Sequence, residues 1–265
     1  LFQEFDLNAF ASASVAQAHH ARLFSGERVV VKIQKSDIQE RILADLSILA
    51  GFAELAEKHI ARLKLYGPSA IVQQFHRTLL AELDFTRERR NLEEFRRNFQ
   101  ADATVHFPKP WPELCRRRVL TMECLEGILG SNLEQLQQAR ADLREFARRG
   151  ANMYLAMIFR DSFYHADPHP GNLLLLPQGV VGVIDCGMTG RLDDALRDEL
   201  EALIVAIAQH NSAAVTDVVW NLSLTPPDGA RDLLRADVAE FVAEYASQSI
   251  SDLNLSEALG NLVEI

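Results

Sequence analysis

The sequence predicts an α+β protein in which a small antiparallel sheet precedes a mainly helical half. Two strand-like segments, residues 13–24 and 27–34, stand near the N-terminus and meet at Ser25-Gly26, which is typical of a hairpin turn. Long helical patterns follow, and the segment after Gly190 has a helical pattern to the end. Because strands and helices are segregated instead of alternating, the pattern favours the α+β class.

The second predicted strand contains "VVVKIQ", residues 29–34. Side chains in a strand alternate between two faces. One face therefore carries Val29, Val31 and Ile33, and the other carries Val30, Lys32 and Gln34. The alternation predicts that Lys32 and Val30 look out from the same side of the sheet.

Two helices are predicted after the hairpin. The segment Ser36–Gln39 has the pattern of a capping box and opens a helix to about residue 60. Its apolar stripe consists of Ile38, Ile42, Leu46 and Leu49. Gly67-Pro68 begins a second, longer helix that we expect to reach about residue 100.

The second helix carries a carboxylate where its core face should be. Its stripe consists of Ala81, Phe85, Glu88, Leu92, Phe95 and Phe99, all apolar except Glu88. A buried charge without a partner costs much free energy, so we expect a cationic partner for Glu88. Arg89 and Arg96 are the nearest alternatives along the chain.

The remaining pattern predicts a strand over 116–125, a helix over 140–163, and two short strands, "NLLLL" and "VVGVID", on either side of Pro177-Gln-Gly179. We predict an N-terminal lobe over residues 1–125 and a helical C-terminal lobe over 126–265. The chain begins at Leu1, from which we expect a fragment of a longer protein.

Composition excludes several classes of function. The net charge of −10 argues against a general nucleic-acid binder. The three cysteines show no C-x-x-C spacing, which argues against a zinc site and a disulfide framework and favours a reducing compartment such as the cytoplasm. No apolar run approaches the roughly 18 residues that a membrane span needs.

The stretch "HADPHPGN", residues 165–172, holds too much proline and glycine for a helix or a central strand, so we predict a loop. Asp167 and Asn172 lie five residues apart in it, and Asp185 ends the later strand in "VIDCG". D-x-x-x-x-N followed by a strand ending in D-x-G is the layout of protein kinases. Asp167 is then the catalytic residue, and Asn172 and Asp185 are hard oxygen ligands for Mg²⁺.

A kinase-like site also needs a strand lysine at the phosphates and a helix glutamate that holds it. Lys32 and Glu88 meet these needs, and Val30 is placed to cover adenine. A metal hydrolase built on His165, Asp167 and His169 is the alternative. The agreement of four elements in order favours the nucleotide site.

The usual glycine-rich phosphate loop is replaced by "ASASVAQAH", residues 11–19. Together with "VVVKIQ", "ELDFTRERRN", "HADPHPGN" and "IDCG", it resembles the UbiB (AarF) family of atypical kinase-like proteins. The resemblance implies a two-lobed protein-kinase-like fold. It assigns the alanine-rich nucleotide loop to Ala11, Ser12, Ala13 and Ser14, the phosphate contact to Lys32, its ion pair to Glu88, the family E-x-D motif to Glu82 and Asp84, the catalytic aspartate to Asp167, and Mg²⁺ binding to Asn172 and Asp185.

The resemblance also implies ATP and Mg²⁺ as cofactors, an atypical kinase or ATPase activity, and a role in ubiquinone or other isoprenoid-quinone biosynthesis. Isoprenoid lipids and enzymes of that pathway are the implied partners, and peripheral membrane association of the full-length protein stays open. A nucleotide-gated lipid-binding scaffold and a small-molecule phosphotransferase of the aminoglycoside or choline kinase type are the alternatives. Two departures stand out: Cys186 replaces the Phe of D-F-G, and the family's K-x-G-Q segment does not precede the alanine-rich loop.

Overall fold

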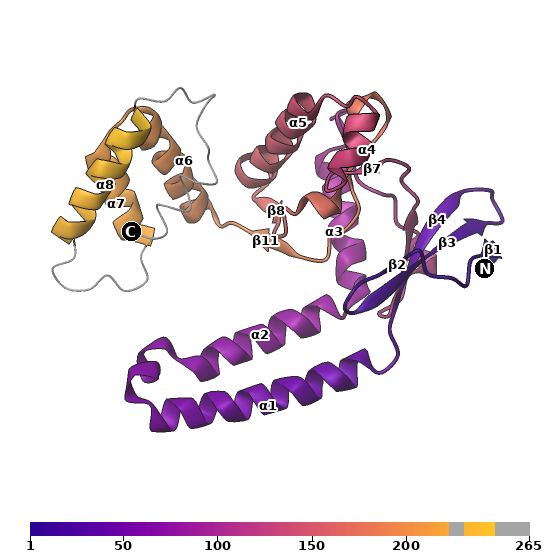
Figure 1. The fold of residues 1–265 in the computed structure, drawn as a ribbon, viewed down its shortest axis with the longest axis horizontal. Coiled ribbons are helices and arrows are strands. Elements are labelled where there is room, and N and C mark those ends of the chain that lie inside the picture. Colours follow the sequence, from indigo (N-terminus) through magenta and orange to yellow (C-terminus); the bar gives the residue numbers. More distant parts are fainter. Residues whose placement is uncertain (223–230, 247–265) are drawn as a thin grey trace. The chain divides into compact units, whose positions relative to one another are not determined.

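The computed structural model describes residues 1–222 and 231–246. These residues form two compact units. The first contains Leu1–Leu155 and Tyr164–Gly190, and the second contains Ala156–Phe163 and the described residues from Arg191 onward. Figure 1 shows strands and a helical hairpin in the first unit and a helical cluster in the second, which confirms the predicted α+β class. The predicted lobe boundary at residue 125 is a separate matter and stays a prediction.

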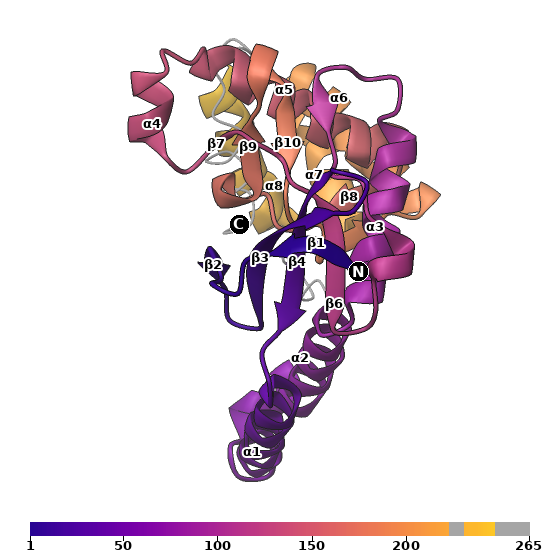
Figure 2. The same cartoon turned by 90° about the vertical axis from the view of Figure 1, so that its right-hand side faces the viewer.

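An antiparallel sheet in the first unit carries the predicted hairpin (Figure 2). Its strands pair in the order β1-β3-β4-β6, and β2 pairs with β3. The strands are β1 (Phe2–Phe5), β2 (Ala11–Ser12), β3 (Ala16–Leu23), β4 (Arg28–Gln34) and β6 (Val119–Glu123). Gly26 makes the predicted turn with a φ of 100°, a value that glycine adopts readily.

The two faces of β4 confirm the predicted alternation. Val29 and Val31 are buried and pack in one apolar cluster with Ala21 and Leu23 of β3. Val30 and Lys32 lie on the other face and line a cavity. The register places Lys32 opposite Ala18.

After β4, α1 (Ile38–His59), a 3₁₀ turn (Ala61–Tyr66) and α2 (Pro68–Glu82) form a helical hairpin, seen edge to edge in Figure 1. The predicted capping box is wrong. Asp37 occupies the N-cap with a φ of 63°, and its side chain makes no capping hydrogen bond. Left-handed backbone at Asp37 turns the chain, so Ser36 does not sit at the helix start.

The helix predicted from residue 67 to about 100 is two helices. α2 ends at Glu82, and α3 spans Phe85–Asn98. Tertiary hydrogen bonds fix the break: the Gln34 side chain donates to the Leu83 carbonyl, and the Phe85 amide donates to the Arg117 carbonyl over 3.0 Å. Asp84 is extended and caps α3 by accepting from the Thr86 amide over 3.0 Å.

α3 buries the stripe predicted for its half of the long helix. Phe85, Glu88, Leu92 and Phe95 are all buried, and so is Phe99 just beyond its end. The Phe95 ring stacks on Phe107 with centroids 5.0 Å apart. The stripe fixes the rotation of α3 about its axis, and that rotation sets where Glu88 points.

A second sheet of the first unit has the order β5-β10-β9-β7. Its strands are β5 (Val105–His106), β7 (Ile128–Leu129), β9 (Leu173–Leu175) and β10 (Val181–Val183), and α4 (Leu133–Gln138) and α5 (Leu143–Leu155) lie between β7 and β9 in sequence. β9 and β10 confirm the two predicted short strands. The predicted helix to residue 163 ends as α5 at Leu155. A π-helical turn (Ala156–Arg160) and β8 (Phe163–His165) follow it.

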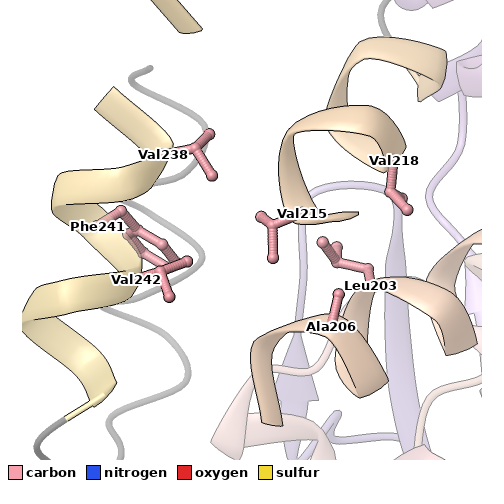
Figure 3. Packing of buried hydrophobic residues seen from close by; sticks show 7 residues of the cluster. All are labelled: Leu203, Ala206, Val215, Val218, Val238, Phe241 and Val242. Atoms are coloured by element: carbon pink, nitrogen blue, oxygen red, sulfur yellow. The ribbon is translucent and has the colours of Figure 1, made fainter. Parts of the chain in front are cut away.

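The second unit contains α6 (Asp194–Ala208), α7 (Ser212–Leu222) and α8 (Arg231–Ala246), after β11 (Thr189–Arg191). Figure 3 shows Val238, Phe241 and Val242 of α8 in its apolar core together with Leu203, Ala206, Val215 and Val218 of the other two helices. The helical pattern predicted after Gly190 is confirmed for these helices. Its parts at 223–230 and 247–265 lie outside the described residues. Within 1–222 and 231–246, every helix is too short or too polar to span a membrane.

Candidate functional site

An ion pair between β4 and α3 forms the centre of the candidate site. Lys32 Nζ lies 2.6 Å from Glu88 Oε1, and the two side chains are 15% and 5% exposed. The partner predicted for Glu88 is therefore Lys32, from a distant strand. The local alternatives are engaged elsewhere, since Arg89 pairs with Glu93 and Arg96 donates to the Phe107 carbonyl.

Asp185 joins this pair from the segment after β10. Its Oδ2 lies 3.2 Å from Lys32 Nζ, and its Oδ1 accepts from the Gly187 amide over 2.9 Å. Burial opposes the charge on Asp185, but Lys32 and the Gly187 amide outweigh it, so the pKa of Asp185 is lowered. Burial alone would lower the pKa of Lys32, yet the carboxylates of Glu88 and Asp185 raise it above its usual value. Lys32 and Asp185 are therefore both ionised at neutral pH.

α3 also holds the residue that follows Asp185. The Cys186 amide donates to Glu88 Oε1 over 3.4 Å, and the Asn91 side chain donates to the Cys186 carbonyl over 2.8 Å. Glu88 and Asn91 lie three residues apart on one face of α3. Cys186 itself is fully buried. The small side chain in place of the phenylalanine of D-F-G thus sits against α3.

The predicted loop at 165–172 folds as a compact turn that brings Asp167 and Asn172 together. The His169 carbonyl accepts from the Asn172 amide, and a 3₁₀ turn spans Pro170–Asn172. The Asn172 side chain donates from Nδ2 to Asp167 Oδ2 over 2.8 Å, which leaves its amide oxygen for another partner. The Asn172 carbonyl accepts from the Ile184 amide over 3.0 Å, so the turn is tied to the residue before Asp185.

His165 has a role that the sequence did not reveal. Its Nδ1 accepts from the Asp167 amide over 3.0 Å, which makes Nε2 the protonated nitrogen that donates to the Asp185 carbonyl. The buried ring therefore connects the two aspartates of the site. With both nitrogens used by the backbone, His165 is no metal ligand, which removes the hydrolase alternative. Consistent with this, the described part of the chain contains no group of three or more His, Cys, Asp or Glu side chains suited to a metal.

The alanine-rich loop lies over one side of the same cavity. Ala11 and Ser12 form β2, paired with Ala18 and Gln17 of β3. Ala11 and Ala13 line the cavity. Ser14 is exposed beyond β2, at the turn back into β3.

The cavity has a volume of about 580 Å³ and two chemically different ends. One end carries Lys32, Glu82, Glu88, Asn172 and Asp185, and the other carries Val30, Phe85, Met122, Leu125, Leu174 and Ile184. The carboxylate of Asp185 and the free amide oxygen of Asn172 are hard oxygen donors, the type that Mg²⁺ prefers. These residues fit a magnesium ion held together with phosphate oxygens.

The two acidic residues of the E-x-D motif are placed differently. Glu82 ends α2 and lines the cavity. Its pKa is raised, first by burial and then by the nearby carboxylates of Asp185 and Asp167. Asp84 instead caps α3 through the Thr86 amide and hydroxyl. Only Glu82 adds charge to the cavity.

Comparison with known proteins gives three findings. The ABC1 atypical kinase-like domain matches residues 1–219. Proteins named "Probable protein kinase UbiB" from Pseudomonas aeruginosa and Pseudomonas entomophila are each 32% identical over 270 residues, which is 100% of this chain and 50% of the relative. The chain thus spans about half the length of the curated relatives it matches.

Among solved structures, the complex of Rv3197 with erythromycin from Mycobacterium tuberculosis matches with a TM-score of 0.68 and 22% identity. The match covers 93% of this chain and 62% of that one. At this identity the likeness concerns the fold. It confirms the protein-kinase-like fold that the motifs implied.

Proposed function

Because this chain belongs to the ABC1 atypical kinase-like family, as its UbiB-like motifs predicted, we propose that it binds ATP with Mg²⁺ in the cavity of the first unit. The proposed reaction is ATP hydrolysis or transfer of the terminal phosphoryl group. One observation carries the proposal. Lys32, Glu88 and Asp185 converge at the end of a cavity whose opposite end is apolar, so one site offers charge for phosphates and an apolar slot for a base.

At the polar end, Lys32 is the proposed contact for phosphate oxygens, and Glu88 holds its ammonium group in place. Asn172 and Asp185 would hold Mg²⁺, which neutralises charge on the phosphate oxygens during transfer. Asp167 would orient the attacking hydroxyl or water. Its Oδ2 accepts from Asn172 over 2.8 Å, so the base and the metal ligand are positioned by one contact.

At the apolar end, Val30 of β4 and Leu174 of β9 both line the cavity and offer apolar surface to a flat base. Met122 lies opposite Val30 in the sheet register and lines the same end. Aliphatic surfaces of this kind bury the ring faces of a purine. We propose that adenine lies here, with its phosphates directed towards Lys32.

For the acceptor, we extend to this chain the role implied by the UbiB resemblance, which is support of isoprenoid-quinone biosynthesis. The proposed acceptor is water or a small molecule of that pathway, and enzymes or lipids of the pathway are the proposed partners. The alanine-rich loop and the E-x-D motif favour this role over an aminoglycoside or choline kinase activity.

The test compares Asp185→Asn with Asp45→Asn, a control on α1, by calorimetric titration of ADP and ATP with and without Mg²⁺. Loss of the Asp185 charge should weaken Mg²⁺-dependent binding at least about tenfold, since a metal ligand and a partner of Lys32 are both lost. Asp45→Asn should bind as the wild type does. Circular dichroism checks that each variant is folded. Magnesium dependence of unchanged size in Asp185→Asn would overturn the assignment.

A further inference from the structure

The alanine-rich loop is held at its tip by Lys35, the residue after β4. Lys35 Nζ donates to the Ala13 carbonyl over 2.6 Å, and the Lys35 amide donates to the Val15 carbonyl over 3.0 Å. One residue thus holds the tip through its side chain and through its backbone. The cavity wall includes Ala13 and Val15, whereas Lys35 stands behind them.

The turn at this tip is closed on itself. The Ala13 amide donates to the Ala16 carbonyl over 2.9 Å. With its carbonyl on Lys35 and its amide on Ala16, Ala13 has both backbone groups satisfied before any ligand arrives. In a glycine-rich loop such amides are free to turn towards phosphate oxygens.

The start of the loop is fixed as well. The Phe10 ring stacks on His20 of β3 with centroids 4.0 Å apart and planes 13° apart. The Phe10 amide donates to the Ala18 carbonyl over 3.0 Å. Because the start is pinned by a ring stack and a backbone bond, the tip is the part that can move, and Lys35 is the cation that restrains it.

We propose that Lys35 is a positioning residue that latches the alanine-rich loop and thereby sets the preference of the site between ADP and ATP. The proposal rests on nucleotide binding in this cavity. With the latch closed, the Ala13 amide is withheld from the terminal phosphate. Opening the latch frees that amide and favours ATP relative to ADP, because ADP lacks the third phosphate.

A bond from an ammonium group to a carbonyl is stronger than a neutral one, but this bond is exposed to water. Its loss should leave global stability nearly unchanged and act on the loop. That separation distinguishes a latch from a general structural role.

The experiment titrates Mg²⁺-ADP and Mg²⁺-ATP against wild type, Lys35→Met, Lys35→Arg and Lys58→Met. Lys35→Met keeps the aliphatic stem and removes the donor, Lys35→Arg keeps a donor, and Lys58 lies on α1 as the matched control. The ratio of Kd for ADP to Kd for ATP should rise about three- to tenfold in Lys35→Met, the range one net hydrogen bond supports. Lys35→Arg and Lys58→Met should keep the wild-type ratio.

Hydrogen exchange of the Ala13 amide gives a second readout, since protection of this amide should fall in Lys35→Met while the melting temperature is kept. An unchanged ratio with nucleotide still bound overturns the latch alone. Equal weakening for both nucleotides with a lower melting temperature also overturns it. Absence of nucleotide binding in the wild type overturns the latch together with the proposed function.

Discussion

α3 and α1 contrast two ways in which a helix can belong to one unit. α3 is short and highly charged, yet Phe85, Glu88, Leu92 and Phe95 are all buried. α1 is longer and richer in apolar residues, yet only Leu46 and Ala53 are buried on it. Burial therefore follows from where a helix packs, and the amount of apolar side chain in it is a poor guide.

The same contrast separates structure from site. α3 contributes Glu88 to Lys32 and Asn91 to the backbone after Asp185, so its packing positions the charges of the cavity. The hairpin of α1 and α2 keeps Ile48, Phe52 and Ile71 exposed and reaches the cavity at Glu82. Substitutions on α3 should accordingly change stability and geometry together, and substitutions along the hairpin should change little.

The largest difference is expected between two phenylalanines. Phe95 is fully buried against Phe107, so Phe95→Ala should lower the free energy of unfolding by about 3–5 kcal/mol. Phe52 is 65% exposed, and Phe52→Ala should stay within about 0.5 kcal/mol of the wild type. Urea unfolding measures both. Similar losses for the two variants would mean that the α1 face is buried in solution.

A smaller loss is expected when α3 keeps its core and loses its ionic partner. Lys32→Ala leaves the Glu88 carboxylate buried without a cation, which should cost about 3 kcal/mol in the absence of nucleotide. Adding Glu88→Gln to Lys32→Ala should recover part of this loss, since the unpaired charge is removed. Lys58→Ala on α1 is the control. An unchanged unfolding free energy in Lys32→Ala would contradict a buried pair.

The smallest effect concerns Glu82, where the hairpin meets the cavity. A carboxyl whose pKa is raised on folding destabilises the folded state once ionised, and this penalty is lost when the pH falls below its unfolded value of about 4.3. Glu82→Gln should therefore raise the melting temperature at pH 8 and leave it unchanged near pH 4. Glu54→Gln on α1 serves as control. A melting temperature that falls at pH 8 would show that the Glu82 charge is instead stabilising.

The regular parts of the fold could be predicted because their side chains repeat with a fixed period. The period of two placed Lys32 and Val30 on one face of β4, and the helical period marked Glu88 as the charge within an apolar stripe. The kinase-like motifs then indicated which loops meet. The family resemblance added the alanine-rich loop and the E-x-D motif.

The features that escaped prediction depend on contacts between distant residues. The apolar stripe runs without interruption through residue 83, so the break between α2 and α3 follows from bonds to Gln34 and Arg117. The bridging role of His165 requires the backbone of Asp185 to approach it, and the Lys35 bond requires the loop to fold back. Local sequence specifies none of these approaches.

The clasp of α3 on Cys186 determines how fast the Asp185 loop can rearrange. Swinging Asp185 out of the cavity would rotate the peptide groups of Cys186, whose amide is bound by Glu88 and whose carbonyl is bound by Asn91. That motion has to detach one face of a buried helix, so it belongs to the slow timescale of sub-global opening and not to the nanosecond-to-microsecond timescale of free loops. The Cys186 amide and the amides in the middle of α3 should consequently exchange with solvent through one common opening event.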